Sequence, residues 1–265
     1  MAEPMNQDNL HEDRDDFPEY RDEEEIQPYE LSEALTSLHL FDGDPYLRTQ
    51  AFNLAIVDKF IMQLEYAALR GLNADERAPV ADRLFLSAQS QMWIFAAYEM
   101  VRTWRERAKD ITKWHDNGGL KLKIDALRRD VGFRHVAREL RAEQLQKIFD
   151  DPSLVTRIQE DLRASHITFA RLEYIRVALA KHEVGGRKKS IAYAPGYGRI
   201  NKWCGSLEYE LENNGVILGT LSRRDIADEL RLLVDRTNLP TDEDLESFDA
   251  SMKVSPPNPF LKEDD

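Results

Sequence analysis

The stretch Ser90-Gln-Met-Trp-Ile-Phe-Ala-Ala-Tyr-Glu-Met-Val-Arg-Thr-Trp104 decides how this chain folds. It lies inside a long predicted helix that begins at about Asp75 or Pro79, ends at about Trp114 and is stopped by the glycine pair at 118–119. Its apolar side chains occupy more than one face, whereas a surface helix has a single apolar stripe. We therefore expect a central helix, either in the middle of one bundle or shared with a second subunit.

A helix is predicted before this one, over about residues 45–70. Asp44 can cap its N-terminus, and Pro45 suits the first helical position because it needs no amide hydrogen there. Apolar residues recur at helical spacing along the segment, which predicts one face packed in a bundle. The expected stripe consists of Phe52, Ile56, Phe60, Leu64 and Ala67, and Ala55, Met62 and Leu69 widen it.

Four further helices are predicted from the same kind of periodicity. Two are long and complete a bundle, over about 120–149 and 152–183. A short amphipathic helix is predicted over 31–41. The last extends from Ser222 to about 237, and its expected buried residues are Ile226, Leu230, Leu233 and Val234. Ser222 and Asp225 have capping-box spacing at its start.

Residues 190–221 break the helical pattern and predict a small antiparallel β insertion. Residues 190–194 have strand character, and 207–211 alternate apolar and acidic side chains with a period of two. The turn sequence at 213–215 is Asn-Asn-Gly, which favours a hairpin that pairs 207–211 with 216–221. The predicted fold is therefore mainly α, an antiparallel four-helix bundle with a β insertion and a C-terminal helix.

Charge divides the chain into three parts. Residues 1–30 contain 12 Asp/Glu and 2 Arg, and residues 240–265 contain 8 Asp/Glu and 2 Lys, so we expect two acidic, disordered tails, the second also rich in proline. The body, 31–239, then has a net charge of +3 within a chain of −13. A mildly basic body suits a polyanion such as RNA.

Composition also predicts the compartment and excludes some chemistry. A single cysteine, Cys204, cannot form an internal disulfide, and no apolar run is long enough for a membrane span or a signal peptide, so we expect a cytoplasmic protein without a membrane partner. Cys204 has no base beside it in the sequence, which argues against a nucleophile. No cluster of cysteine and histidine has metal-ligand spacing, so neither a metal nor another cofactor is predicted.

The segment Arg171-Leu-Glu-Tyr-Ile-Arg-Val-Ala-Leu-Ala-Lys-His182 carries the chemistry that the sequence suggests. Arg176 can grip phosphate oxygens with its planar fork, and His182 can transfer protons near neutral pH. Six positions at about 100° each place the two about 120° apart around a helix, so they converge only in a frayed last turn or across a symmetric dimer. The alternative is structural: Glu173 pairs with Arg176, and both basic residues finish a helix.

The run Arg176-Val-Ala-Leu-Ala-Lys-His182 resembles the Arg-x4-6-His signature of the HEPN superfamily (higher eukaryotes and prokaryotes nucleotide-binding). The order of elements is similar too: antiparallel helices, the motif at a helix end, a small strand insertion and a closing helix. The resemblance covers about 45–237, but only the motif is residue-specific. Val177 departs from the pattern, since a polar residue usually follows the arginine.

The resemblance implies a dimeric helical bundle in which Arg and His of two subunits line one cleft. Many members are metal-independent RNases, often toxins or phage-defence effectors, and others only bind nucleotides or RNA. By match, Arg176 would hold the scissile phosphate, and His182 would act as general acid and base or position the ribose 2′-hydroxyl. The resemblance also implies an antitoxin-like protein partner that restrains such an enzyme.

A second group of residues suggests contact with RNA. Basic and aromatic side chains mix between 187 and 203, and such mixtures grip phosphate and stack on exposed bases. The candidates are Arg187, Lys188, Lys189, Tyr197 and Arg199. The alternative is that the aromatics pack the sheet onto the bundle. For the whole protein the alternative to an RNase is a non-catalytic helical scaffold with acidic docking tails.

Overall fold

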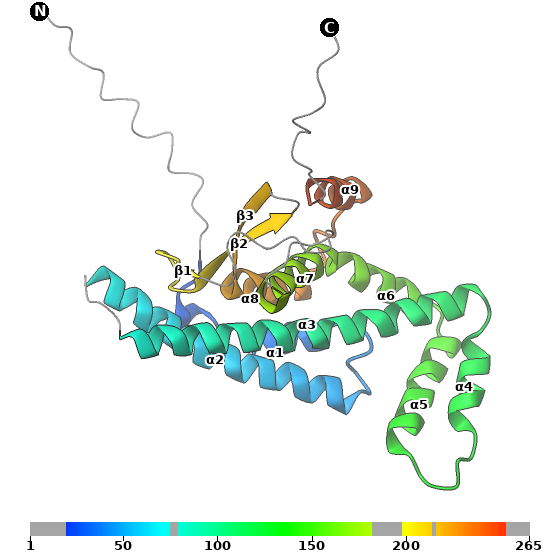
Figure 1. Cartoon of the computed structure of the whole chain (residues 1–265). Coiled ribbons are helices and arrows are strands. Elements are labelled where there is room, and N and C mark those ends of the chain that lie inside the picture. The colour runs from blue at the N-terminus through cyan, green and yellow to red at the C-terminus, as the bar shows by residue number, and fades with distance from the viewer. Residues whose placement is uncertain (1–19, 75–78, 182–197, 214–215, 253–265) are drawn as a thin grey trace, which may run out of the picture.

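A computed structural model describes residues 20–74, 79–181, 198–213 and 216–252. The protein is mainly helical, with a small antiparallel sheet (Figure 1). The helices α2 (Pro45–Asn73) and α3 (Val80–Asp116) are the two longest, pack against each other and confirm the first two predicted bundle helices. Among the described helices, none is both long and apolar enough to cross a membrane.

Helix α2 begins as predicted but buries a different face. The Asp44 carboxylate accepts hydrogen bonds from the backbone N–H groups of Tyr46 and Leu47, each at 3.0 Å. The stripe expected to face the core is largely outside, because Phe52 is 40%, Ile56 61% and Phe60 45% exposed. Of the predicted apolar residues, Ala55 and Met62 are buried. The face that is buried consists of Leu47, Ala51, Leu54, Ala55, Asp58, Ile61, Met62 and Glu65.

The prediction of one continuous helix over 120–149 is wrong, because the chain turns in the middle of this segment. The segment forms a helical hairpin of α4 (Leu120–Arg128) and α5 (Val136–Asp150), which projects from the C-terminal end of α3 (Figure 1). The turn has a local cause: the Asp130 side chain accepts a hydrogen bond from the Gly132 N–H at 2.8 Å, and Gly132 has φ +81°. Asp and Gly favour this turn conformation over helix.

The predicted helix 152–183 is also two helices, α6 (Ser153–Ala164) and α7 (His166–Lys181). They meet at Ser165, where a side chain from α3 enters the backbone ladder. Arg105 Nη1 donates to the carbonyl oxygen of Leu162 at 2.9 Å and to Ser165 Oγ at 2.6 Å. A long-range arginine that captures a helical carbonyl is a recognised cause of a break.

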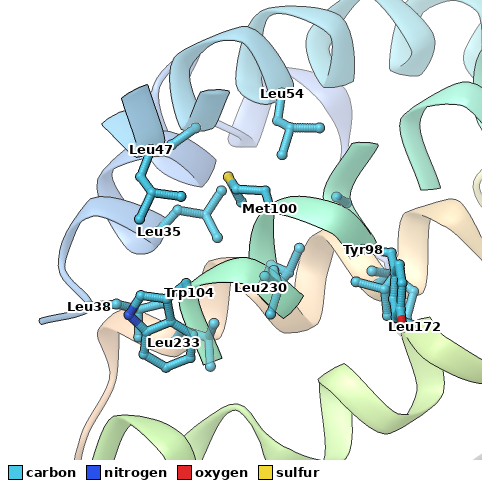
Figure 2. Close-up of a cluster of buried hydrophobic side chains, with 14 of the residues drawn as sticks. Leu35, Leu38, Leu47, Leu54, Tyr98, Met100, Trp104, Leu172, Leu230 and Leu233 are labelled. Carbon is cyan, nitrogen blue, oxygen red and sulfur yellow. The ribbon is translucent and has the colours of Figure 1, made fainter. Parts of the chain in front are cut away.

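The predicted antiparallel four-helix bundle is not confirmed, because these two helices are divided and two short helices belong to the core. Helix α1 (Glu30–Thr36) packs against α2 and α8 (Arg223–Arg231), while α3 contacts α6, α7 and α8. Figure 2 shows how the elements meet in one core. It labels Leu35, Leu38, Leu47, Leu54, Tyr98, Met100, Trp104, Leu172, Leu230 and Leu233.

The β insertion confirms the predicted hairpin. Strands β1 (Arg199–Ile200), β2 (Leu207–Asn213) and β3 (Val216–Ser222) form an antiparallel sheet in that order, and β2 pairs with β3 up to Asn213 opposite Val216. The strand predicted at 190–194 lies outside the described residues.

The closing helix confirms the predicted start but not all of the buried face. The Ser222–Asp225 capping box is present at the start of α8. Ile226, Leu230 and Leu233 are buried as predicted. Val234, at the end of the 3-10 helix η3 (Leu232–Val234), is exposed instead, so that part of the prediction is wrong.

Parts of both predicted tails are folded onto the body. The Tyr20 hydroxyl donates to Asp225 at 2.7 Å, Ile26 is buried, and residues 23–25 form the 3-10 helix η2 (Glu23–Glu25). Near the other end, α9 (Asp242–Ser251) contacts α7. Specific contacts with the body therefore outweigh the acidic composition of 20–30 and 242–251, whereas residues 1–19 and 253–265 are outside the described part.

A cluster of buried charges joins α2 to α8. Arg223 is fully buried and pairs with Asp58 and with Glu65, whose Oε2 lies 2.6 Å from Arg223 Nη2. Arg231 pairs with the other oxygen of Asp58. Ser206 Oγ, from the loop before β2, donates to Glu65 at 2.7 Å. Burial lowers the pKa of Arg223, but the two carboxylates outweigh it and raise that pKa above its ordinary value.

Gly205 allows this loop to approach α2, and Gly205→Ala is expected to lower the free energy of unfolding by about 3 kcal/mol. A Cβ would lie 1.9 Å from the Glu65 carbonyl oxygen, and φ is +75°. The matched control is Gly118→Ala, with φ +71° and open space around the Cβ, which should cost only about 1 kcal/mol. Urea unfolding measures both. Equal losses would mean that the close approach is absent.

Candidate functional site around Arg176

Arg176 lies near the C-terminal end of α7, on the side that faces α3. The α7 helix contacts α3, α8 and β2, and its buried residues Leu172, Ile175 and Leu179 fix its rotation against them. This orientation leaves Arg176 at the edge of the core. Its side chain is 30% exposed, so the guanidinium is neither buried nor free in solvent.

The Arg176 guanidinium lies at one end of a column in which two stacked aromatic rings are flanked by two arginines. Its Cζ lies 4.9 Å from the centre of the Tyr98 ring. Tyr98 stacks on Phe169, with 5.7 Å between ring centres and 13° between ring planes. On Phe169 lies a second guanidinium, that of Arg105, 4.8 Å from the ring centre. Cation–π contacts of this kind orient a guanidinium while its N–H edge stays available for an oxygen ligand.

The Tyr98 hydroxyl is tied to α7 as well. It donates to Glu173 Oε1 at 3.2 Å. Burial raises the pKa of Tyr98, Glu173 adds to that effect, and Arg176 and Arg102 oppose it. Tyr98 therefore stays a neutral donor, and Glu173 accepts its hydrogen bond. The predicted pair of Glu173 with Arg176 does not occur among the ion pairs of the described residues; Arg176 turns to α3 instead.

The acidic contact of Arg176 is weak. Its Nη2 lies 3.9 Å from Oε1 of Glu99, and among the described residues no other carboxylate is closer than 4 Å. Glu99 is shared, because Arg102 Nη2 lies 2.8 Å from Glu99 Oε2. One carboxylate thus faces two arginines, although Glu106 also pairs with Arg102 at 2.6 Å. The ion pair that holds Arg176 is therefore long and shared, and a phosphate oxygen could replace Glu99 as the partner of Arg176.

Most of the other predicted site residues lie outside the described residues. This applies to His182, so the structure does not place it relative to Arg176, and to Arg187, Lys188, Lys189 and Tyr197. Arg199 is described: it is strongly exposed on β1 and donates to Glu210 on β2 at 2.7 Å.

Two expected absences can be examined in the described residues. Cys204 is fully buried, and burial raises the pKa of its thiol to about 12, so it cannot supply a thiolate at neutral pH. Within the described part, no group of three or more His, Cys, Asp or Glu side chains could hold a metal ion. Trp93 and Trp104 are buried in the core, as expected of that helix.

Two features escaped the sequence analysis. The first is the Tyr98–Phe169 stack, which depends on residues about 70 positions apart and has no local signal. The second is the charged cluster. Asp58 and Glu65 did carry a signal, since they are seven positions apart on the same face as Ile61. A carboxylate on the buried face of a helix implies a buried basic partner.

Comparisons with known proteins found no matching family model, no significantly similar curated protein and no significantly similar solved structure.

Proposed function

We propose that this protein is a metal-independent RNA endonuclease, or an RNA-binding protein, of HEPN type, with Arg176 and His182 at its site. The observation that carries the proposal is the state of Arg176. A guanidinium oriented by Tyr98, partly exposed and held by one long ion pair is suited to exchange Glu99 for a phosphate oxygen. A guanidinium used only to join helices would be expected to make a closer ion pair.

The proposed reaction uses the RNA's own 2′-hydroxyl. The 2′-oxygen attacks phosphorus, and the bond from phosphorus to the next nucleotide's 5′-oxygen breaks. His182 takes the 2′-hydroxyl proton and a proton passes from His182 to the leaving 5′-oxygen, while Arg176 stabilises the negative charge on the phosphorane. The products are a 2′,3′-cyclic phosphate and a 5′-hydroxyl.

A second copy of the chain completes the site in this proposal, and the outer face of α2 and α3 supports it. Phe52, Ile56 and Phe60 form an exposed apolar stripe, and the Phe60 and Phe85 rings meet edge to face with 6.4 Å between centres. A groove of about 450 Å³ between the two helices continues this face and reaches Glu99, the partner of Arg176. Exposed apolar patches of this kind mark interaction surfaces.

Ile56→Glu is therefore expected to weaken a homodimer by about tenfold or more, because it places a charge in an apolar interface. Ile56 is 61% exposed, so the fold should tolerate the change. Leu122→Glu is the matched control, at a 73% exposed leucine on α4. Sedimentation equilibrium of the parent and both variants measures the dissociation constants. A monomeric parent, or equal effects of both substitutions, would contradict the dimer.

The alternative, a non-catalytic scaffold, is favoured by one observation. The column from Arg176 to Arg105 connects α7 with α3, so Arg176 also has a structural use. Under this alternative, the acidic segments bind partner proteins, and Arg176 and His182 only stabilise the end of a helix.

Expression in a bacterial host separates the two functions. The RNase proposal expects the parent to slow growth and His182→Ala to relieve this at an equal level of folded protein. His166→Ala, at the first residue of α7, is the matched control and should remain as toxic as the parent. Equal growth of the parent, both variants and an empty vector would favour the scaffold.

A further inference from the structure

A continuous groove follows α5 from the start of α2 to the tip of the α4–α5 hairpin. It consists of two adjoining cavities of about 240 Å³ and 530 Å³, which share Leu127, His135 and Arg138 in their walls. The first is bounded by the beginning of α2 and by α3, and the second by the turn between α4 and α5. The outer cavity therefore lies on the α4–α5 hairpin that projects from the helical body (Figure 1), and the inner cavity lies where this hairpin meets α2 and α3.

Arginines dominate the walls of this groove, which is unusual in a chain whose net charge is −13. They are Arg107, Arg128, Arg129, Arg134, Arg138 and Arg141. The carboxylates that line it are Asp44, Asp130 and Glu139. The arginines thus outnumber the acids, and the surface attracts anions.

The acids are already engaged, so they leave much of the positive charge unbalanced. Asp44 caps α2 and pairs with Arg107. Glu139 pairs with Arg134 at 3.1 Å, and Asp130 accepts the backbone hydrogen bond that forms the turn.

The other arginines of the groove form no ion pair with a carboxylate in the described part of the chain. Arg138 donates to the carbonyl oxygen of Ala126 at 2.8 Å, a neutral acceptor. Arg128 and Arg129 are exposed and have no ion pair with any described residue.

The inner end of the groove concentrates charge further. Arg141 is partly buried, and its side chain donates to the neutral amide of Gln144. Burial lowers the pKa of Arg141 to about 10, and the neighbouring charge of Arg107 acts in the same direction. Asp44 and Asp110 oppose this lowering but do not cancel it, so an anion bound beside the two arginines would stabilise their charge.

Exposed aromatic rings stand at both ends of the groove. Phe133 lines the outer cavity and is 67% exposed, and Tyr46 lines the inner cavity and is 66% exposed. An exposed ring beside unpaired guanidinium groups is the combination that binds single-stranded nucleic acid, because bases stack on the ring and phosphates meet the cations.

We infer that this arginine-lined groove binds a single strand of RNA, with its phosphates along Arg128, Arg129 and Arg138 and a base stacked on Phe133. The groove deepens the proposed function and rests on it, since it supplies the RNA contact that Arg176 alone cannot make. The concave walls favour a strand over a lipid bilayer, because a bilayer surface cannot enter a cavity. Cavities of a few hundred Å³ also match small ligands the size of a nucleotide.

The test is the binding of a fluorescent single-stranded RNA to the full chain, read by anisotropy at two salt concentrations. Arg128→Gln/Arg129→Gln is expected to weaken binding about tenfold or more and to reduce the salt dependence by about two phosphate contacts. Arg83→Gln/Arg157→Gln is the matched control, since both arginines are exposed outside the groove. Phe133→Ala should weaken binding at least about fivefold.

Three results would overturn the groove: no RNA binding by the parent, equal weakening by the two double variants, or binding to vesicles of anionic lipid that replaces RNA binding and depends on Arg128 and Arg129. Circular dichroism confirms that each variant is folded. Binding that depends on the groove without any cleavage would leave the groove intact and reject the RNase. Cleavage at the parent's rate by all the groove variants would reject the groove and leave the RNase proposal standing.

Discussion

Asp58→Asn is expected to lower the free energy of unfolding by about 3–5 kcal/mol. The Asp58 carboxylate is 2% exposed and receives Arg223 on one oxygen and Arg231 on the other. Asparagine keeps the size but offers one acceptor oxygen and no charge. Arg223 would keep only Glu65, and Arg231 would keep only Asp228, which it shares with Arg224. The buried positive charge would then be incompletely compensated, which is among the costliest defects in a core.

Urea unfolding followed by circular dichroism and by tryptophan fluorescence measures this loss. Arg223 lies over Trp93, 5.3 Å from the ring centre, so fluorescence reports on the cluster itself. Asp125→Asn is the matched control, an identical substitution at an exposed position on α4, and should change stability by no more than about 0.5 kcal/mol. If Asp58→Asn behaved like the control, the cluster that joins α2 to α8 would not be buried as described.

His182→Ala is expected to reduce RNA cleavage by about 10²- to 10⁴-fold, because it removes the group that transfers protons. Arg176→Ala should cost about 10²- to 10³-fold, because the phosphorane loses its charged donor. Arg176→Lys keeps the charge but not the planar fork, so an intermediate loss is expected. Rates come from a time course with end-labelled RNA.

Each of these variants needs a control for folding. Arg176→Ala removes a cation–π contact with Tyr98, which should cost about 1 kcal/mol of stability, too little to unfold a stable domain. Arg157→Ala, at an exposed arginine on α6, and His166→Ala should cleave like the parent. Activity that survives in Arg176→Ala would assign this arginine to structure alone.

The sequence could predict those parts of the fold that depend on interactions between neighbouring residues. Three such features were predicted: the cap at Asp44, the capping box at Ser222 and the hairpin at 213–215. The structure confirms the helices and strands that begin or end at them. The break at Ser165 could not be predicted, because Arg105, 60 positions earlier, captures the backbone there. Asp130 and Gly132 do favour a turn in the sequence, but the helical periodicity on both sides of them predicted one continuous helix.

The candidate site also has a part that the sequence could predict and a part that depends on distant residues. The residue types at 176 and 182 suggested phosphate chemistry, but the state of Arg176 depends on Tyr98 and Glu99 from another helix. The exposed stripe of α2 has the same periodicity as a buried one, and only the buried carboxylates beside it distinguish the two faces. The groove along α5 needed the hairpin, which no periodicity indicated.

Incubation of the purified chain with labelled RNA in EDTA, beside Arg176→Ala and His182→Ala proteins of confirmed fold, tests the proposed function most directly. We expect cleavage by the parent alone, with 2′,3′-cyclic phosphate ends. Equal cleavage by all three proteins, or none by any of them on every RNA tried, would contradict a metal-free RNase site at these two residues.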